Sequence, residues 1–182
     1  LRIGYGDEKT RSGKAAVDEL ASALLLRGAQ GLNRQQIRDR LDALRASGGL
    51  GLGGGSFQTK RAYINDLIAL VAQVYRGATF PADELELVRK ESITALEESA
   101  KDPESIAFTA LERHFSHYPR GDVRYVPTVA EHIADLKAVT RDQVLRYANA
   151  MRGLSAAEIA VVGDFDAASL KAALTRAFAA SK

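Results

Sequence analysis

Three stretches with strand character lie far apart in this chain of 182 residues, and helical sequence separates them. At the start, Leu1, Ile3 and Tyr5 are apolar at every second position. The second stretch is the glycine-rich run Ser47–Phe57, and the third is the apolar, β-branched run Ala157–Gly163. Such distant strands can share one sheet only through long-range pairing, with the intervening helices packed on it. The sequence therefore predicts an α+β fold: an antiparallel-type sheet with helices packed on it.

Roughly seven helices are expected between these strands. The first, Gly13–Gly28, carries Val17, Leu20 and Leu24 at helical spacing, and we expect this apolar face to pack against the sheet. Capping boxes predict three further starts, which are Asn33 with Gln36, Thr128 with Glu131, and Thr140 with Gln143. Other helices are expected over about 61–75, from Pro81 to about Ala100, after Asp102-Pro103, and from Asp166 to about Ala180. The segment Gly6–Lys9 is expected to be a polar turn, and His117–Asp122 a surface loop.

Composition excludes several classes of site. The chain has no cysteine, which removes disulfides, thiolate zinc sites and cysteine nucleophiles. A formal net charge of +2 without a long basic run does not indicate a nucleic-acid partner. No apolar run approaches the ~18 residues that span a membrane. Cysteine-free chains occur in both the cytosol and the periplasm, and of the two we expect the periplasm.

The glycine-rich segment raises the question of a phosphate-binding loop. It lacks the Gly-Lys-Ser/Thr of a P-loop, and a helix precedes it where a dinucleotide-binding fingerprint requires a strand. We therefore expect residues 48–55 to be a strand connection, either one or two strands or a hairpin with a flexible tip. Whether this hairpin is complete is left open by the sequence.

Histidines and acidic residues supply two candidate metal or acid–base clusters. His114 and His117 lie three residues apart beside Glu112, but two imidazoles without a third ligand make a poor metal site. His132 is interpreted as a surface helix residue. No metal site is predicted in this domain.

Glu91, Glu97 and Glu98 share one predicted helix, and Glu91 and Glu98 lie on one face of it. A solvated acidic face is the favoured interpretation of these glutamates, because no histidine partner is indicated.

Four ordered stretches nevertheless resemble a known family. They are Leu24–Ala29, then Phe80–Glu84 with Val88–Lys90 and Asp102-Pro103, then Tyr118-Pro119 through Ile133–Leu136 to Val144, and finally Ile159–Asp166. In this order they resemble a single domain of the pitrilysin/insulinase family of zinc peptidases, the inverted HxxEH class. The resemblance implies the metallopeptidase (LuxS/MPP-like) fold. The glycine-rich segment departs from it, because it is shorter and richer in glycine than the hairpin expected there.

The resemblance also shows where a catalytic zinc site would lie. In active members, HxxEH precedes the apolar-Arg-Gly end of the first helix, where two His bind zinc and the Glu activates water. Counting back from Arg27-Gly28 places the two His positions at Glu19 and Ala23, and the Glu position at Ser22. A later metal-binding Glu would fall near Ala95, or at Glu97 or Glu98 after a short shift. Alanine cannot bind zinc and serine is a poor base, so we expect a catalytically inactive domain with no catalytic, cofactor-binding or metal residues.

The resemblance implies a role beside an active partner. We expect residues 1–182 to be one inactive peptidase-like domain, a fragment of a longer multi-domain chain. It would pair with a zinc-bearing domain or subunit of the same family, with zinc only in that partner, and would form part of a chamber for a peptide or unfolded protein. Whether the chain counts as an enzyme stays open, since the parent protein would be a bacterial-type zinc metalloendopeptidase. The alternative is a non-enzymatic scaffold or assembly subunit with the same fold.

Overall fold

The computed structural model describes residues 1–4, 6–153 and 156–178, and their arrangement confirms the predicted α+β class. Its main sheet has four antiparallel strands in the order β4-β5-β1-β6, with bounds Ser47–Gly51, Gly54–Gln58, Arg2–Ile3 and Ala157–Glu158. A small two-stranded sheet pairs β2 (Gly28–Ala29) with β3 (Leu32–Asn33). The sheet therefore joins residues from both ends of the described chain.

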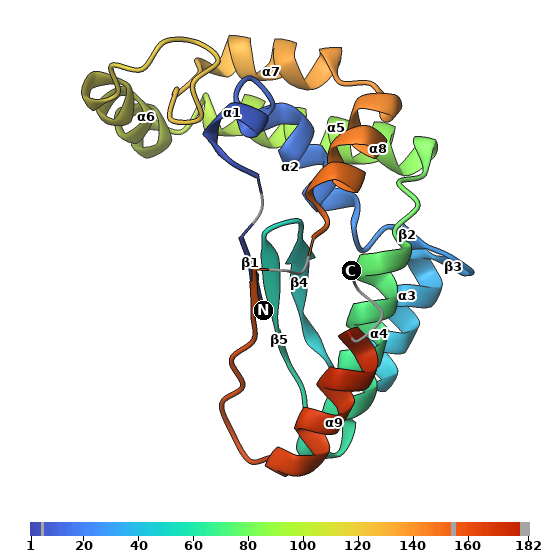
Figure 1. Cartoon of the computed structure of the whole chain (residues 1–182). Coiled ribbons are helices and arrows are strands. Elements are labelled where there is room, and N and C mark those ends of the chain that lie inside the picture. The colour runs from blue at the N-terminus through green and yellow to red at the C-terminus, as the bar shows by residue number, and fades with distance from the viewer. Residues whose placement is uncertain (5, 154–155, 179–182) are drawn as a thin grey trace.

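Helices make up the rest of the fold (Figure 1). In chain order they are α1 Glu8–Arg11, α2 Ala15–Leu24, α3 Arg34–Ala43, the 3₁₀ turn η1 Arg61–Tyr63, α4 Ile64–Gly77, α5 Ala82–Ser99, α6 Pro103–Phe115, α7 Val129–Ala138, α8 Arg141–Met151 and α9 Ala167–Phe178. Figure 1 shows α3, α4 and α9 along the sheet, and α2, α5, α7 and α8 as a second group beyond the β4–β5 turn. At the edge of that group, α6 projects away from the sheet.

The predicted helix caps are confirmed. The side chains of Asn33, Thr128 and Thr140 each accept a hydrogen bond from the backbone N–H three residues on, and each box is reciprocal. Asp166 also caps α9, since the Ser169 N–H donates to its carboxylate at 2.7 Å. These starts are local, because the cap and its partner lie within one turn of each other.

The glycine-rich segment is a complete hairpin. β4 and β5 pair from Ser47 with Gln58 to Gly51 with Gly54, so a two-residue turn joins them. The pairing thus answers the question that the sequence left open, whether residues 48–55 complete a hairpin. The second hairpin, β2–β3, was not expected from the sequence; its two-residue strands are too short to show a period.

Two sequence-based assignments are wrong. Residues 6–9 do not form a simple turn, because Asp7 caps the short helix α1 and its carboxylate accepts from the Thr10 N–H at 2.7 Å. The strand expected over 157–163 is only the two residues of β6. β6 is short because its partner β1 is short: Arg2 pairs with Glu158 and Ile3 with Ala157. After Glu158 the described residues provide no further strand for the chain to pair with. Tyr5 and the expected helix end near Ala180 lie outside the described residues.

The core is built around α2. Leu20 and Leu24 are both 0% exposed, and α2 contacts α5, α7, α8 and β4. Arg89 of α5 fixes the end of α7, since its guanidinium donates to the carbonyls of Leu136 and Val139. An arginine on the last carbonyls of a helix satisfies groups that the helix itself leaves unpaired. The predicted apolar face of the first helix is thus confirmed as buried, although its surroundings are mainly other helices.

Substitution of two glycines in the β4–β5 hairpin should have different effects on stability. A Cβ at Gly55 would lie 2.1 Å from the Gly49 carbonyl oxygen, whereas a Cβ at Gly49 would meet no atom within 4 Å. We expect Gly55→Ala to lower the free energy of unfolding by about 1–3 kcal/mol, because the strands must separate locally. The matched Gly49→Ala variant should stay within about 0.5 kcal/mol of the parent chain in urea denaturation. Equal stability of the two variants would contradict this account of the hairpin.

Candidate functional site

The candidate site is the exposed surface of α2 that carries Glu19, Ser22 and Ala23, the positions indicated by the family resemblance in the sequence. Glu19 and Ala23 lie one helical turn apart and so share a face, and Ser22 lies next to Ala23. Ala23 is exposed, while Glu19 and Ser22 are half-buried. The neighbouring Leu20 and Leu24 point into the core, which fixes the direction of this face. The structure therefore brings all three predicted positions to one surface.

Glu19 is paired with a histidine from a distant helix. His132 Nε2 of α7 lies 2.7 Å from Glu19 Oε2, and the side chains are 27% and 35% exposed. In the sequence His132 was interpreted as a surface helix residue, so this contact was missed. No spacing signal indicates it, because the two residues are 113 positions apart. The Glu19 carboxylate is thus held by an imidazole of the same chain.

Glu131, the residue before His132, closes the capping box at the start of α7. This carboxylate accepts from the Thr128 backbone N–H at 2.8 Å and from the Tyr125 hydroxyl at 3.0 Å. Arg120 lies 3.1 Å from its other oxygen. The hydrogen bonds from Thr128, followed by those from Tyr125 and the charge of Arg120, lower the pKa of Glu131 to about 2. Glu131 therefore stays ionised over a wide pH range and keeps the first turn of α7 closed.

Ser22 has a structural partner of its own. Its Oγ accepts a hydrogen bond from the Leu52 N–H at 3.2 Å, at the tip of the β4–β5 hairpin. A Cβ placed on Gly51 would approach Ser22 Oγ to 3.4 Å, so the hairpin tip lies directly on α2. A serine engaged in this way ties the hairpin to the helix, and it supplies no base for activating water.

The acidic residues of α5 do not form one cluster with α2. Glu91 pairs with Arg27 at 2.7 Å, and Glu84 lies 3.4 Å from the same guanidinium. Glu98 instead pairs with Lys101 at 2.9 Å, and Glu97 is exposed on the same helix. Glu91 and Glu98 thus pair with different basic groups, and Arg27 ties α5 to the chain just after α2.

The other histidines lie far from this surface. His114 is exposed at the end of α6 and its ring stacks edge-on against Phe115, with centroids 5.3 Å apart. His117 is exposed in the following loop, as expected. Over residues 1–4, 6–153 and 156–178, no three His, Asp or Glu side chains gather in a way that could hold a metal ion. The described helices also include none long and apolar enough to cross a membrane.

Solved structures of other proteins share this fold. A crystal structure titled peptidase M16 inactive domain, from Pseudomonas fluorescens, superposes with a TM-score of 0.70 at 20% identity over 96% of this chain. A protease from Helicobacter pylori superposes with a TM-score of 0.78 at 12% identity over 98% of this chain. The chain has the fold of these two proteins, a helix-covered antiparallel sheet.

The matched region is only part of each of these proteins. This chain spans 43% of the Pseudomonas fluorescens chain and 44% of the Helicobacter pylori chain. Comparison with protein-family models and with curated proteins gave no match. The similarity is therefore established at the level of the fold.

The lowered pKa of Glu131 predicts a pH dependence of stability. Its pKa is 4.5 ordinarily and about 2 in the folded chain, so its stabilising contribution is complete above the ordinary value and is lost as pH falls toward about 2. Glu131→Gln keeps an acceptor for the capping box but cannot titrate. We expect the variant to lose less stability than the parent chain between pH 6 and pH 3 in urea denaturation. If both proteins lost the same free energy of unfolding between pH 6 and pH 3, the ionised Glu131 carboxylate would make no pH-dependent contribution to stability.

Two substitutions should convert this surface into a metal site. In the double variant Glu19→His with Ala23→His, two imidazoles share one helix face and His132 already reaches position 19. Three imidazoles are a common zinc ligand set, so we expect zinc binding in a competition assay with a chromogenic chelator. Adding His132→Ala should weaken that binding at least about tenfold, because one of the three ligands is lost. Equal affinities with and without His132 would contradict the geometry of the site.

Proposed function

We propose that this chain is a non-catalytic domain of a pitrilysin/insulinase-type zinc peptidase. It forms part of a chamber wall and pairs with a zinc-bearing domain or subunit, which hydrolyses an extended peptide or unfolded protein. Zinc belongs to that partner. The observation that supports the proposal is that Glu19 and Ser22 of α2 are engaged within the chain and Ala23 has no donor atom, at the positions where the family resemblance would place the metal ligands and the catalytic base.

Each of these positions has a contact within the chain or lacks a donor. Glu19 lies within hydrogen-bond distance of His132, and Ser22 holds the hairpin tip through the Leu52 N–H. Ala23 has no donor atom at all. A zinc ligand set needs at least three donors directed at one point, and this face offers one carboxylate that is already paired. This face of α2 is therefore suited to lining the substrate chamber and not to binding zinc.

The fold neighbours support the pairing. One of the two is itself titled an inactive domain of peptidase M16, and both are more than twice as long as this chain. A polypeptide of that size has room for a second domain of the same type. The zinc-bearing partner is proposed on this basis.

Helix α6 offers a surface for such a partner. Phe108, Leu111 and Phe115 fall on one face of α6 and are 62%, 53% and 71% exposed. No residue of this helix is buried. Large apolar side chains gathered on one exposed helix face are typical of a protein–protein contact. We assign this face, the α6 apolar face, to the contact with the zinc-bearing domain.

The test of this function mixes the chain with a zinc-bearing domain or subunit. That partner carries HxxEH and is encoded in the same gene as this chain or in a neighbouring gene. The chain alone should bind no stoichiometric zinc and cleave no unfolded casein, whereas the assembled pair should cleave it. The variant Phe108→Ser with Phe115→Ser should weaken assembly at least about tenfold, since truncated aromatic anchors cost more than 1 kcal/mol each. Calorimetric titration measures this affinity.

The matched control is Ile106→Ser. Ile106 is 50% exposed on the other side of α6, so its loss should leave assembly unchanged. Zinc binding and proteolysis by this chain alone would overturn the proposal. Assembly without any gain in casein cleavage would favour the alternative, a non-enzymatic assembly subunit.

A further inference from the structure

Helix α6 is amphipathic in the opposite sense to the core helices. Its half-buried residues, Ser105 and Thr109, are small and polar, whereas Phe108, Leu111 and Phe115 are exposed. Among the described helices and strands, none packs extensively on α6, and Figure 1 shows this helix set apart from the main sheet. The α6 apolar face therefore points away from the domain.

Polar contacts fix α6 near both of its ends. At the start, the Asp102 carboxylate accepts hydrogen bonds from the Ser105 N–H at 2.9 Å and from the Ser105 hydroxyl at 2.7 Å. Near the end, Arg113 donates to the Val126 carbonyl at 2.9 Å. A helix that is already ordered loses less conformational entropy when it binds, so α6 is suited to dock as one unit.

Two glutamates lie at the ends of the α6 apolar face. Glu104 lies one turn before Phe108 and Glu112 lies one turn after it, so the three side chains follow one row along the helix. Both glutamates are exposed, and neither forms an ion pair with another residue of the described chain. A carboxylate that is covered by a partner without receiving a cation loses its hydration with no compensation. The surface that covers this face therefore needs a positive charge near each glutamate.

We propose that α6 docks into an apolar groove of the zinc-bearing domain or subunit, and that this groove carries a lysine or arginine at each end, opposite Glu104 and Glu112. Phe108, Leu111 and Phe115 are the anchors, and their spacing of i, i+3 and i+7 is that of helices that bind apolar grooves. The inference rests on the proposed function, which supplies the partner. It adds the shape and the charge of the surface that the partner presents.

The charge of α6 disfavours a membrane as the occupant. Helices that lie on anionic membranes carry lysine and arginine beside their apolar face. The α6 apolar face has Glu104 and Glu112 in those places, and anionic lipid headgroups repel carboxylates. A protein with basic residues is the better match.

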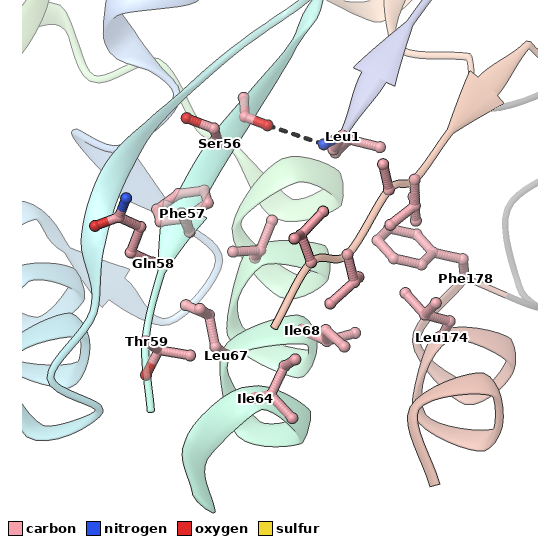
Figure 2. Close-up of a pocket in the computed structure, with 16 residues that line it drawn as sticks. Leu1, Ser56, Phe57, Gln58, Thr59, Ile64, Leu67, Ile68, Leu174 and Phe178 are labelled. Atoms are coloured by element: carbon pink, nitrogen blue, oxygen red, sulfur yellow. Dashed lines mark hydrogen bonds between the residues drawn. The ribbon is translucent and has the colours of Figure 1, made fainter. Parts of the chain in front are cut away.

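A second copy of this chain is also a poorer match. It offers an apolar groove of about 540 Å³ beside β5, which Ile68, Leu174 and Phe178 help to line (Figure 2). The described residues that line this groove include no lysine or arginine side chain. Docking of α6 there would leave Glu104 and Glu112 without partners.

The test reverses both charges in the full chain and measures assembly with the zinc-bearing partner by calorimetric titration. We expect Glu104→Lys with Glu112→Lys to raise the Kd at least about tenfold, because repulsion replaces attraction at both ends of the groove. The matched control, Asp42→Lys with Asp66→Lys, makes the same change in net charge on α3 and α4, away from α6 (Figure 1). The control should change the Kd less than about twofold at physiological salt, since distant exposed charges are screened.

Salt supplies a second measurement that does not depend on how stable the variants are. The affinity of the parent chain should weaken as NaCl rises from about 50 mM to about 500 mM, because salt screens the attraction. The affinity of the Glu104→Lys, Glu112→Lys variant should instead strengthen, because salt screens the repulsion. Opposite salt dependences of the two proteins are the result expected for basic residues opposite these two positions.

Four results would overturn the proposal. If charge reversal left the Kd unchanged while Phe108→Ser with Phe115→Ser still weakened assembly, the basic groove would be wrong and the proposed function would stand. Failure of the parent chain to assemble with the partner would overturn both. Self-association of the chain alone in ultracentrifugation, abolished by Phe108→Ser with Phe115→Ser, would assign the α6 apolar face to a second copy. Binding to phosphatidylglycerol vesicles, abolished by the same variant, would assign it to a membrane.

Discussion

Burial of the apolar face of α2 is the constraint on which the rest of this structure depends. Leu20 and Leu24 are inaccessible to solvent, and they lie where α5, α7, α8 and the β4–β5 hairpin converge. Polar contacts then fix each neighbour to α2 or to the chain just after it: His132 from α7, the Leu52 N–H from the hairpin, and Glu91 from α5 through Arg27. The same helix that anchors the core thus determines the candidate site.

This arrangement also describes the chemistry of the α2 surface. A catalytic zinc helix must leave donor atoms free toward an open coordination position. Here the one carboxylate on that face, Glu19, is paired with His132, and the serine is engaged with the hairpin. These contacts stabilise the packing of the helix group, and the α6 apolar face is the surface that we propose for a partner.

Local features were predictable from the sequence, and long-range ones were not. The capping boxes at Asn33, Thr128 and Thr140 were recognised because each lies within one helical turn. The strand over 157–163 was overestimated, because β-branched residues favour an extended chain but only a neighbouring strand completes it. Of the site, Glu19, Ser22 and Ala23 were placed through the family resemblance, whereas His132 was missed for lack of any spacing signal.

The sequence by itself determined the α+β class, the order of the helices and the presence of Glu19, Ser22 and Ala23 on one helix, because residue identity and helical period are local properties. Only the tertiary structure decided that His132 contacts Glu19, that Ser22 holds a hairpin tip, and that β1 lies centrally in the sheet. Those facts arise from pairings between residues 30 or more positions apart. Such pairings are selected by the packing of the whole domain, and no local pattern encodes them.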